Sequence, residues 1–117
     1  MDLPNSVDIL GHPYEIVMKE DLLDCMGMCN TDQCIIYIST TSSDSQKLDT
    51  LFHEILEAFN YQLEMKLKHR NIQALGNCFY LLLKSNPDLV SMFIQKNKDE
   101  DEESKLKVGF KVDKDKI

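Results

Sequence analysis

The sequence has no apolar run that approaches the roughly 20 residues needed to span a bilayer. Its first ten residues, MDLPNSVDIL, lack the basic start and the apolar stretch of a signal peptide. No internal repeat is visible. The chain has 117 residues, of which 43% are hydrophobic and 28% are charged, and these values are ordinary for one soluble globular domain. We therefore expect a cytoplasmic protein, with no membrane partner and one modest core.

The cysteines form no C-x-x-C pair. Cys25, Cys29, Cys34 and Cys78 are spaced unlike the ligands of a zinc ribbon or a zinc finger. In a cytosolic protein such residues are expected to be reduced and mostly buried, where they pack as small apolar groups. A metal-binding role for Cys25 and Cys29 is the alternative that their spacing leaves open.

Positive charge is scarce in most of the chain, whose formal net charge is −7. Residues 96–117 hold seven lysines and seven acidic residues, so the net charge falls entirely on residues 1–95, which hold six basic and thirteen acidic groups. An acidic body repels phosphate backbones, and we expect no nucleic-acid partner. We expect residues 1–95 to form the domain and residues 96–117 to form a charged, mobile tail.

Alternating apolar and polar residues predict two short strands within residues 7–18, joined by a turn at residues 11–13. Residues 34–39, CIIYIS, are β-branched and apolar on both faces, which predicts a strand that is packed on both sides. Between these strands we expect a helical turn near Leu22 and a loop around Gly27 and Asn30.

Apolar residues with a 3.6-residue period predict a long helix from about residue 46 to about residue 67. These residues are Leu48, Leu51, Phe52, Ile55, Leu56, Phe59 and Leu63. A second helix is predicted to begin near His69, and its later part, CFYLLL, is apolar all round and is expected to be buried. A third helix is predicted after Asn86, a candidate cap, with Pro87 in its first turn. The expected fold class is α+β, with a small N-terminal antiparallel or mixed sheet packed on about three helices.

The first helix contains the sequence HEILE at residues 53–57. His53 and Glu57 are four residues apart, and a helix places them on one face, about 40° apart around its axis. The motif H-E-x-x-H presents two zinc ligands in this way, and a carboxylate oxygen binds zinc at nearly the same distance as an imidazole nitrogen. Glu54 occupies the position of the general base in that motif. A solvated helix face opposite the apolar stripe would show the same pattern.

A catalytic zinc ion normally takes three protein ligands and leaves one position for water. His69 is the best candidate for the third ligand, because an antiparallel return would bring the start of the second helix beside the first. Glu64 is the competitor, since it lies on the same helix face as Glu57, two turns later. A closed structural site that includes Glu64 or a cysteine is a further alternative.

Four stretches of the chain carry a family resemblance: VDILGHPYEIV, GMCNTDQCIIYIS, TLFHEILEA and KHRNIQALGN. In this order they resemble small, often phage-encoded members of the zincin-like ImmA/IrrE metallopeptidase family. The resemblance covers about residues 7 to 90, and TLFHEILEA and KHRNIQALGN are its most specific parts. It implies a zincin-like fold and a zinc cofactor. In a phage-encoded protein, the compartment would be the cytoplasm of the host cell.

The same resemblance implies roles for individual residues. His53, Glu57 and His69 would bind the metal, and Glu54 would be the catalytic base. The strand Ile36–Ile38 would be the edge strand beside which a peptide substrate lies. Glu57 departs from the common motif of the family, which has a second histidine at this position.

Two functions are therefore expected from the sequence. The first is a zinc-dependent peptidase that hydrolyses a peptide bond in a protein substrate. The alternative is a non-catalytic, phage-type interaction protein that binds and modulates a host protein through a peptidase-like scaffold. The sequence does not indicate an oligomeric state.

Overall fold

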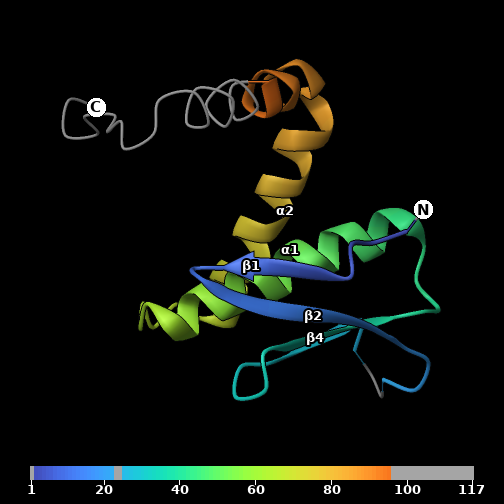
Figure 1. Cartoon of the computed structure of the whole chain (residues 1–117), viewed down its shortest axis with the longest axis vertical. Coiled ribbons are helices and arrows are strands. Elements are labelled where there is room, and N and C mark those ends of the chain that lie inside the picture. The colour runs from blue at the N-terminus through green and yellow to red at the C-terminus, as the bar shows by residue number, and fades with distance from the viewer. Residues whose placement is uncertain (1, 23–24, 96–117) are drawn as a thin grey trace, which may run out of the picture. The chain divides into compact units, whose positions relative to one another are not determined.

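The computed structural model describes residues 2–22 and 25–95 (Figure 1). These residues form an α+β fold, which confirms the predicted class. Its elements are β1 (Ser6–Ile9), β2 (His12–Lys19), β3 (Gly27–Asn30), β4 (Ile35–Ser39), α1 (Asp44–Gln62) and α2 (His69–Ser85). Residues 87–95 are also helical. The chain divides into two compact units, one extending to Leu82 and the other beginning at Leu83.

The four strands form a mixed sheet in the order β1-β2-β4-β3. β1 pairs with β2 and β3 pairs with β4 in antiparallel fashion, whereas β2 and β4 are parallel. The hairpin turn lies at Leu10 and Gly11, whose φ angles are 54° and 86°, and the Gly11 N–H donates to Asp8 Oδ1. The predicted turn at residues 11–13 is therefore misplaced, because His12 and Pro13 already belong to β2.

The segment that was expected to be a loop around Gly27 and Asn30 is the strand β3. Its four residues include no β-branched side chain, and the strand exists because it pairs with β4 from Gly27↔Ile38 to Asn30↔Ile35. Such pairing overrides weak local propensity. The predicted helical turn near Leu22 is wrong for that residue, which is not helical, and residues 23–24 lie outside the described part.

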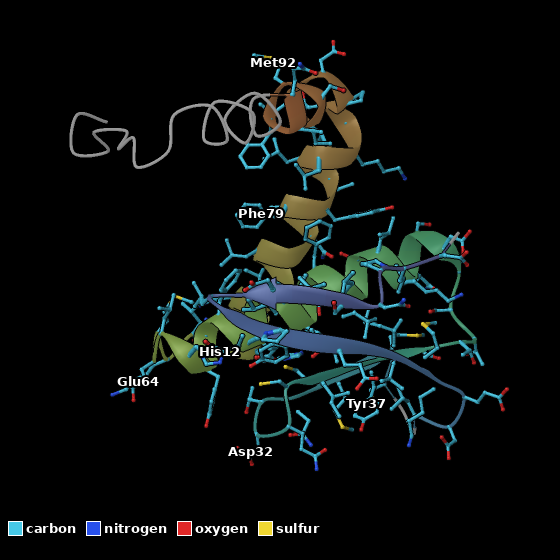
Figure 2. The ribbon with its side chains drawn as sticks, viewed as in Figure 1. His12, Asp32, Tyr37, Glu64, Phe79 and Met92 are labelled. Carbon is cyan, nitrogen blue, oxygen red and sulfur yellow. The ribbon has the colours of Figure 1, made fainter. Side chains whose placement is uncertain are left out.

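The strand β4 is packed firmly on one face only. Ile36 and Ile38 are fully buried, while Tyr37, between them, is only partly buried. Figure 2 shows Tyr37 on the side of the sheet away from α1. The prediction of packing on both sides is therefore wrong. β4 also lies between β2 and β3, so Ile36–Ile38 is an interior strand, and β3 is the edge strand on that side.

The helix α1 covers the buried face of the sheet (Figure 1). Ser43 caps its start and forms a capping box with Gln46, so the helix begins two residues before the predicted position. It ends at Gln62, earlier than predicted, because Glu64 and Lys66 adopt left-handed φ angles of 50° and 59° that no helix can continue. The buried core that α1 completes consists of Ile9, Tyr14, Ile36, Ile38, Leu51 and Ala58.

The helix α2 begins at His69, as the sequence predicts. Its predicted burial on all sides is wrong, because Phe79, Leu81 and Leu82 are 45%, 55% and 46% exposed. Figure 2 shows Phe79 projecting from the helix. α2 packs on α1 over a narrow strip instead, in which the buried residues are Ile72 and Gly76.

The helical segment 87–95 confirms the third predicted helix. The carbonyl oxygen of Asn86 accepts bonds from the N–H groups of Leu89 and Val90, so the first turn starts there. Within the described ranges, no helix is long and apolar enough to cross a bilayer. The predicted tail, residues 96–117, lies outside those ranges.

Candidate metal centre

Three side chains from two helices meet at one point. His53 and Glu57 lie one turn apart on α1, and the Nε2 atom of His53 is 3.5 Å from the Oε2 atom of Glu57. His69, the first residue of α2, places its Nδ1 atom 3.5 Å from the same oxygen. One ligand atom from each residue lies within 4.8 Å of the other two. His69, not Glu64, is therefore the third member of the group.

Glu64 does not join this group. It follows the end of α1 with a φ of 50°, and its side chain is exposed. Figure 2 shows Glu64 beyond the last turn of the helix. Glu64 would lie on the same helix face as Glu57, two turns later, only if α1 continued past Gln62. Because α1 ends at Gln62, Glu64 is not part of the site.

The distances from the two imidazoles to Glu57 are close to the spacing of ligand atoms around a zinc ion. Ligand atoms about 2.0–2.1 Å from a tetrahedral zinc ion are separated by about 3.3 Å. The two distances to Glu57 Oε2 are 3.5 Å, and all three ligand atoms lie within 4.8 Å of one another, so the side chains would have to move closer together to surround one ion. Two imidazoles and one carboxylate leave a fourth position, which is the ligand set of a catalytic rather than a closed structural site.

The site is buried on the α1 side. His53 is 9% exposed and Glu54 is 7% exposed, so a site on the outer, solvated face of α1 is ruled out. β3 and α2 cover this face of α1: Gly27 of β3 lies against Glu54, and Gly76 of α2 lies against His53. A helical wheel drawn for α1 alone places these residues on a solvated face, because it takes no account of contacts with β3 and α2.

Burial prepares His53 to bind a metal. Desolvation lowers the pKa of His53, and the negative charge of Glu57 opposes this effect only in part. The imidazole is therefore neutral at neutral pH, which is the form that binds metals. Its Nδ1 atom is buried and has no hydrogen-bond partner among the described residues.

Glu54 has the properties of a general base. Burial, and then the nearby charge of Glu57, raise the pKa of Glu54 from 4.5 to about 7. A carboxyl group with such a pKa can both accept and return a proton near neutral pH. No partner in the described part of the chain neutralises Glu54 with an ion pair.

Two hollows adjoin the site, and Gly27, His53, Glu54 and His69 line both of them. The first has a volume of about 310 Å³ and extends along the earlier turns of α1, past Thr50, Asp49 and Gln46. The second has a volume of about 500 Å³ and extends the other way, past Glu57, Asn60 and Tyr61. The site is therefore accessible from two sides along α1. Tyr61 is 58% exposed at the end of the second hollow.

No family model matches the chain, and neither the curated proteins nor the solved structures give a significant match. What the site can do follows from its own side chains. It has three convergent side chains that could bind a metal ion, a buried carboxyl group beside them, and open space on both sides.

The sequence KHRNIQALGN supplies more of the site than His69. Gln73 lines the first hollow, and Gly76 touches His53. With the side-chain amide of Asn77 oriented so that its nitrogen faces α1, that nitrogen donates to both carboxylate oxygens of Asp49 at 2.8 Å. Residues 69, 73, 76 and 77 share one helix face, and this periodicity from His69 is the signal that could have revealed these contacts.

Gly76 sets the distance between α1 and α2. A Cβ atom at this position would lie 3.3 Å from the Cα atom and 3.4 Å from the backbone nitrogen of His53. Backbone atoms in the middle of a helix cannot move aside as a flexible side chain can. A side chain at residue 76 would therefore push the two helices apart by a few tenths of an ångström, away from the spacing at which His69 reaches Glu57.

We predict that Gly76→Val lowers the free energy of unfolding by about 1–3 kcal/mol, because the added methyl groups separate the two helices. It should also weaken zinc binding, since His69 moves with α2. Chemical denaturation and zinc titration measure the two effects. Cys78→Val is the matched control, because Cys78 is exposed on the same helix. Equal zinc affinity in both variants would contradict the role given to Gly76.

The cysteines do not belong to the metal group. Cys25 lines the first hollow and Cys29 lines the second, but neither is among the residues whose ligand atoms converge. Burial, followed by the charges of Glu54 and Glu57, raises the pKa of Cys29 to about 12, which keeps it as a thiol. Cys25 and Cys78 are exposed, and Cys29 and Cys34 are only partly buried, so the expectation of mostly buried cysteines is wrong.

Proposed function

We propose that this protein is a zinc-dependent peptidase of the zincin-like ImmA/IrrE type, in which His53, Glu57 and His69 hold the metal. One observation carries the proposal: these three residues, from two separate helices, bring ligand atoms within 4.8 Å of one another beside the buried Glu54. A solvated, charged face of α1 alone does not account for the position of His69, which comes from α2.

Each residue has a distinct role in the proposed hydrolysis. His53, Glu57 and His69 would hold a zinc ion, which would supply the Lewis acidity that activates water near neutral pH and polarises the scissile carbonyl group. Glu54 accepts the proton of the attacking water and delivers it to the leaving amine nitrogen. Without the metal, burial raises the pKa of Glu54 to about 7, and the positive charge of a bound zinc ion would lower it. The buried setting of His53 and Glu54 excludes bulk water from that side of the reaction.

The edge strand β3 is the element along which an extended substrate would lie. The Ser39 N–H donates to the Met26 carbonyl, and Met28 is paired with Tyr37. Because hydrogen-bonded pairs alternate along an antiparallel ladder, the backbone groups of Gly27 and Cys29 point away from β4. They are available to a peptide that adds a strand to this edge.

The position of Gly27 supports this arrangement. A Cβ atom there would lie 3.3 Å from Glu54 Oε2 and 2.5 Å from Thr50 Cγ2, so the absence of a side chain lets the strand edge approach the catalytic carboxyl group. A substrate paired with Gly27 would pass directly over the site. β3 takes the role that the sequence assigned to Ile36–Ile38.

The proposal is tested by incubating the zinc-loaded protein with a library of peptides and detecting new termini by mass spectrometry. We expect cleavage that stops with a chelator and returns when zinc is added. His69→Ala should lose cleavage, whereas His12→Ala should keep it, because His12 is an exposed residue of β2 that lies outside the site. Cleavage that survives in His69→Ala would contradict the proposal.

One observation favours the alternative function, a non-catalytic protein that binds and modulates a host protein. Leu75, Phe79 and Leu82 lie on one face of α2 and are 40%, 45% and 46% exposed. An exposed apolar stripe of this kind is suited to contact with a partner. The two functions separate by mutation: catalysis requires Glu54, whereas a binding function requires Phe79 and tolerates Glu54→Gln. Partner capture by Glu54→Gln and Phe79→Ser distinguishes them.

A further inference from the structure

We propose that the first hollow is a subsite for a basic side chain of the substrate, and that Asp49 is the residue that selects it. The proposal rests on the proposed function, because it concerns the residue next to the bond that is cleaved. The Asp49 hollow is the name used below for this space, which is bounded by Gln46, Asp49, Thr50 and Gln73 together with the residues of the metal centre.

The Asp49 hollow is continuous with the metal centre. His53, Glu54 and His69 form one end of it, and Asp49 lies one helical turn before His53. Its volume of about 310 Å³ is at the lower end of ligand pockets, which suits one long side chain rather than a separate ligand. A substrate paired with β3 would direct the side chain of a residue flanking the scissile bond into this space.

Asp49 is held ready to bind a cation. With the Asn77 amide oriented so that its nitrogen faces Asp49, this nitrogen donates to each of the two carboxylate oxygens at 2.8 Å, which fixes the orientation of the carboxylate. An ionised carboxylate offers about four acceptor positions, and Asn77 uses two of them. The remaining two can accept the parallel N–H groups of a guanidinium or the ammonium of a lysine. Asn77 thus serves as a positioning residue for Asp49.

The charges around the site favour the same class of side chain. No lysine or arginine of the described ranges lines either hollow, while Asp49, Glu54 and Glu57 all do. In the proposed site Glu57 binds the metal and Glu54 accepts a proton, so Asp49 is the carboxylate left for the substrate. An acidic substrate side chain would be repelled. Among the residues that the structure describes, Met26 is the one large apolar side chain that lines the Asp49 hollow, so these residues offer little to an apolar substrate side chain.

Amino-acid hydroxamates test the subsite without a known substrate, because the hydroxamate group binds zinc while the side chain enters the adjacent space. Arginine hydroxamate should bind the zinc-loaded protein about tenfold more tightly than norleucine hydroxamate, which has a neutral chain, in calorimetric titrations. Glutamate hydroxamate should bind more weakly than either. Asp49→Asn should abolish the preference for arginine while leaving the affinity for norleucine hydroxamate and the zinc content unchanged.

Asp32→Asn is the matched control, because it removes the same charge from an exposed residue in the β3–β4 turn that lines neither hollow (Figure 2). It should keep the preference for arginine. Equal binding of the three hydroxamates to the zinc-loaded protein, or a preference for arginine that survives in Asp49→Asn, would overturn the subsite and leave the proposed peptidase intact. A protein that takes up no zinc would overturn both.

Discussion

Protein purified without a metal-affinity tag should contain about one zinc ion per chain, and His53→Ala should contain none. His53 supplies a buried, neutral imidazole whose Nε2 atom faces the Glu57 carboxylate, so its removal leaves one imidazole and one carboxylate, which hold zinc weakly. The loss of affinity should exceed about 100-fold, since outer-shell changes alone cost 10- to 100-fold. Elemental analysis by mass spectrometry measures the content directly.

The control for this measurement is His12→Ala, which should keep its zinc because His12 lies on β2, outside the metal group. His69→Ala should lose zinc with little change in stability, because the His69 side chain is 74% exposed and contributes little to the core. Zinc that remains bound in both His53→Ala and His69→Ala would place the metal elsewhere. If the unmodified protein takes up no zinc when zinc is added, His53, Glu57 and His69 do not form a metal site.

Glu54→Gln should reduce peptide hydrolysis by about 10²- to 10⁴-fold while the bound zinc stays in place. The substitution preserves the size of the side chain and removes only its ability to accept a proton. Because Glu54 is absent from the group of metal ligands, the zinc content of the variant should equal that of the unmodified protein. Retained hydrolysis in Glu54→Gln would remove Glu54 from the role of base.

The same substitution should stabilise the metal-free protein at alkaline pH. Folding raises the pKa of Glu54 from 4.5 to about 7, so the folded chain holds the proton more tightly than the unfolded chain. The resulting stability is fully present below pH 4.5 and is lost as the pH rises through 7. A shift of this size corresponds to about 3 kcal/mol at most. Glutamine has no proton to lose and escapes this loss.

Urea denaturation with a chelator present, at pH 4.5 and at pH 8, measures the effect. Glu54→Gln and the unmodified protein should differ little at pH 4.5, and the variant should be more stable by about 2–3 kcal/mol at pH 8. Glu15→Gln is the matched control, since Glu15 is exposed on β2 and should show no such gain. If Glu54→Gln were no more stable than the unmodified protein at pH 8, burial would not be raising the pKa of Glu54.

Local patterns determined the two helices that carry the site. The apolar period along α1 and the pairing of Ser43 with Gln46 specify a helix without any distant contact. Once α1 is a helix, the spacing of His53 and Glu57 places both on one face. The predicted start of α2 at His69 was also confirmed, and the residues His53, Glu57 and His69 predicted from the sequence do converge.

Local patterns were insufficient where distant contacts decide the structure. Residues 27–30 have little strand propensity, and only the ladder with β4 makes them a strand. That ladder also moves Ile36–Ile38 from the edge of the sheet to its interior. A short stretch of sequence does not indicate which strands lie beside each other. The loop expected at residues 27–30 and the edge position expected for Ile36–Ile38 were both wrong because the pairing of β3 with β4 was not predicted.

The sequence by itself determined the α+β class, the helices, and the chemical identity of the residues that can bind a metal. The tertiary structure decided whether those residues act together. It placed His69 within reach of Glu57, chose it over Glu64 by ending α1 at Gln62, and buried Glu54 against β3. The physical reason is that helix formation depends on neighbours within one or two turns, whereas burial and ligand convergence depend on two glycines, Gly27 and Gly76, that let separate elements approach closely.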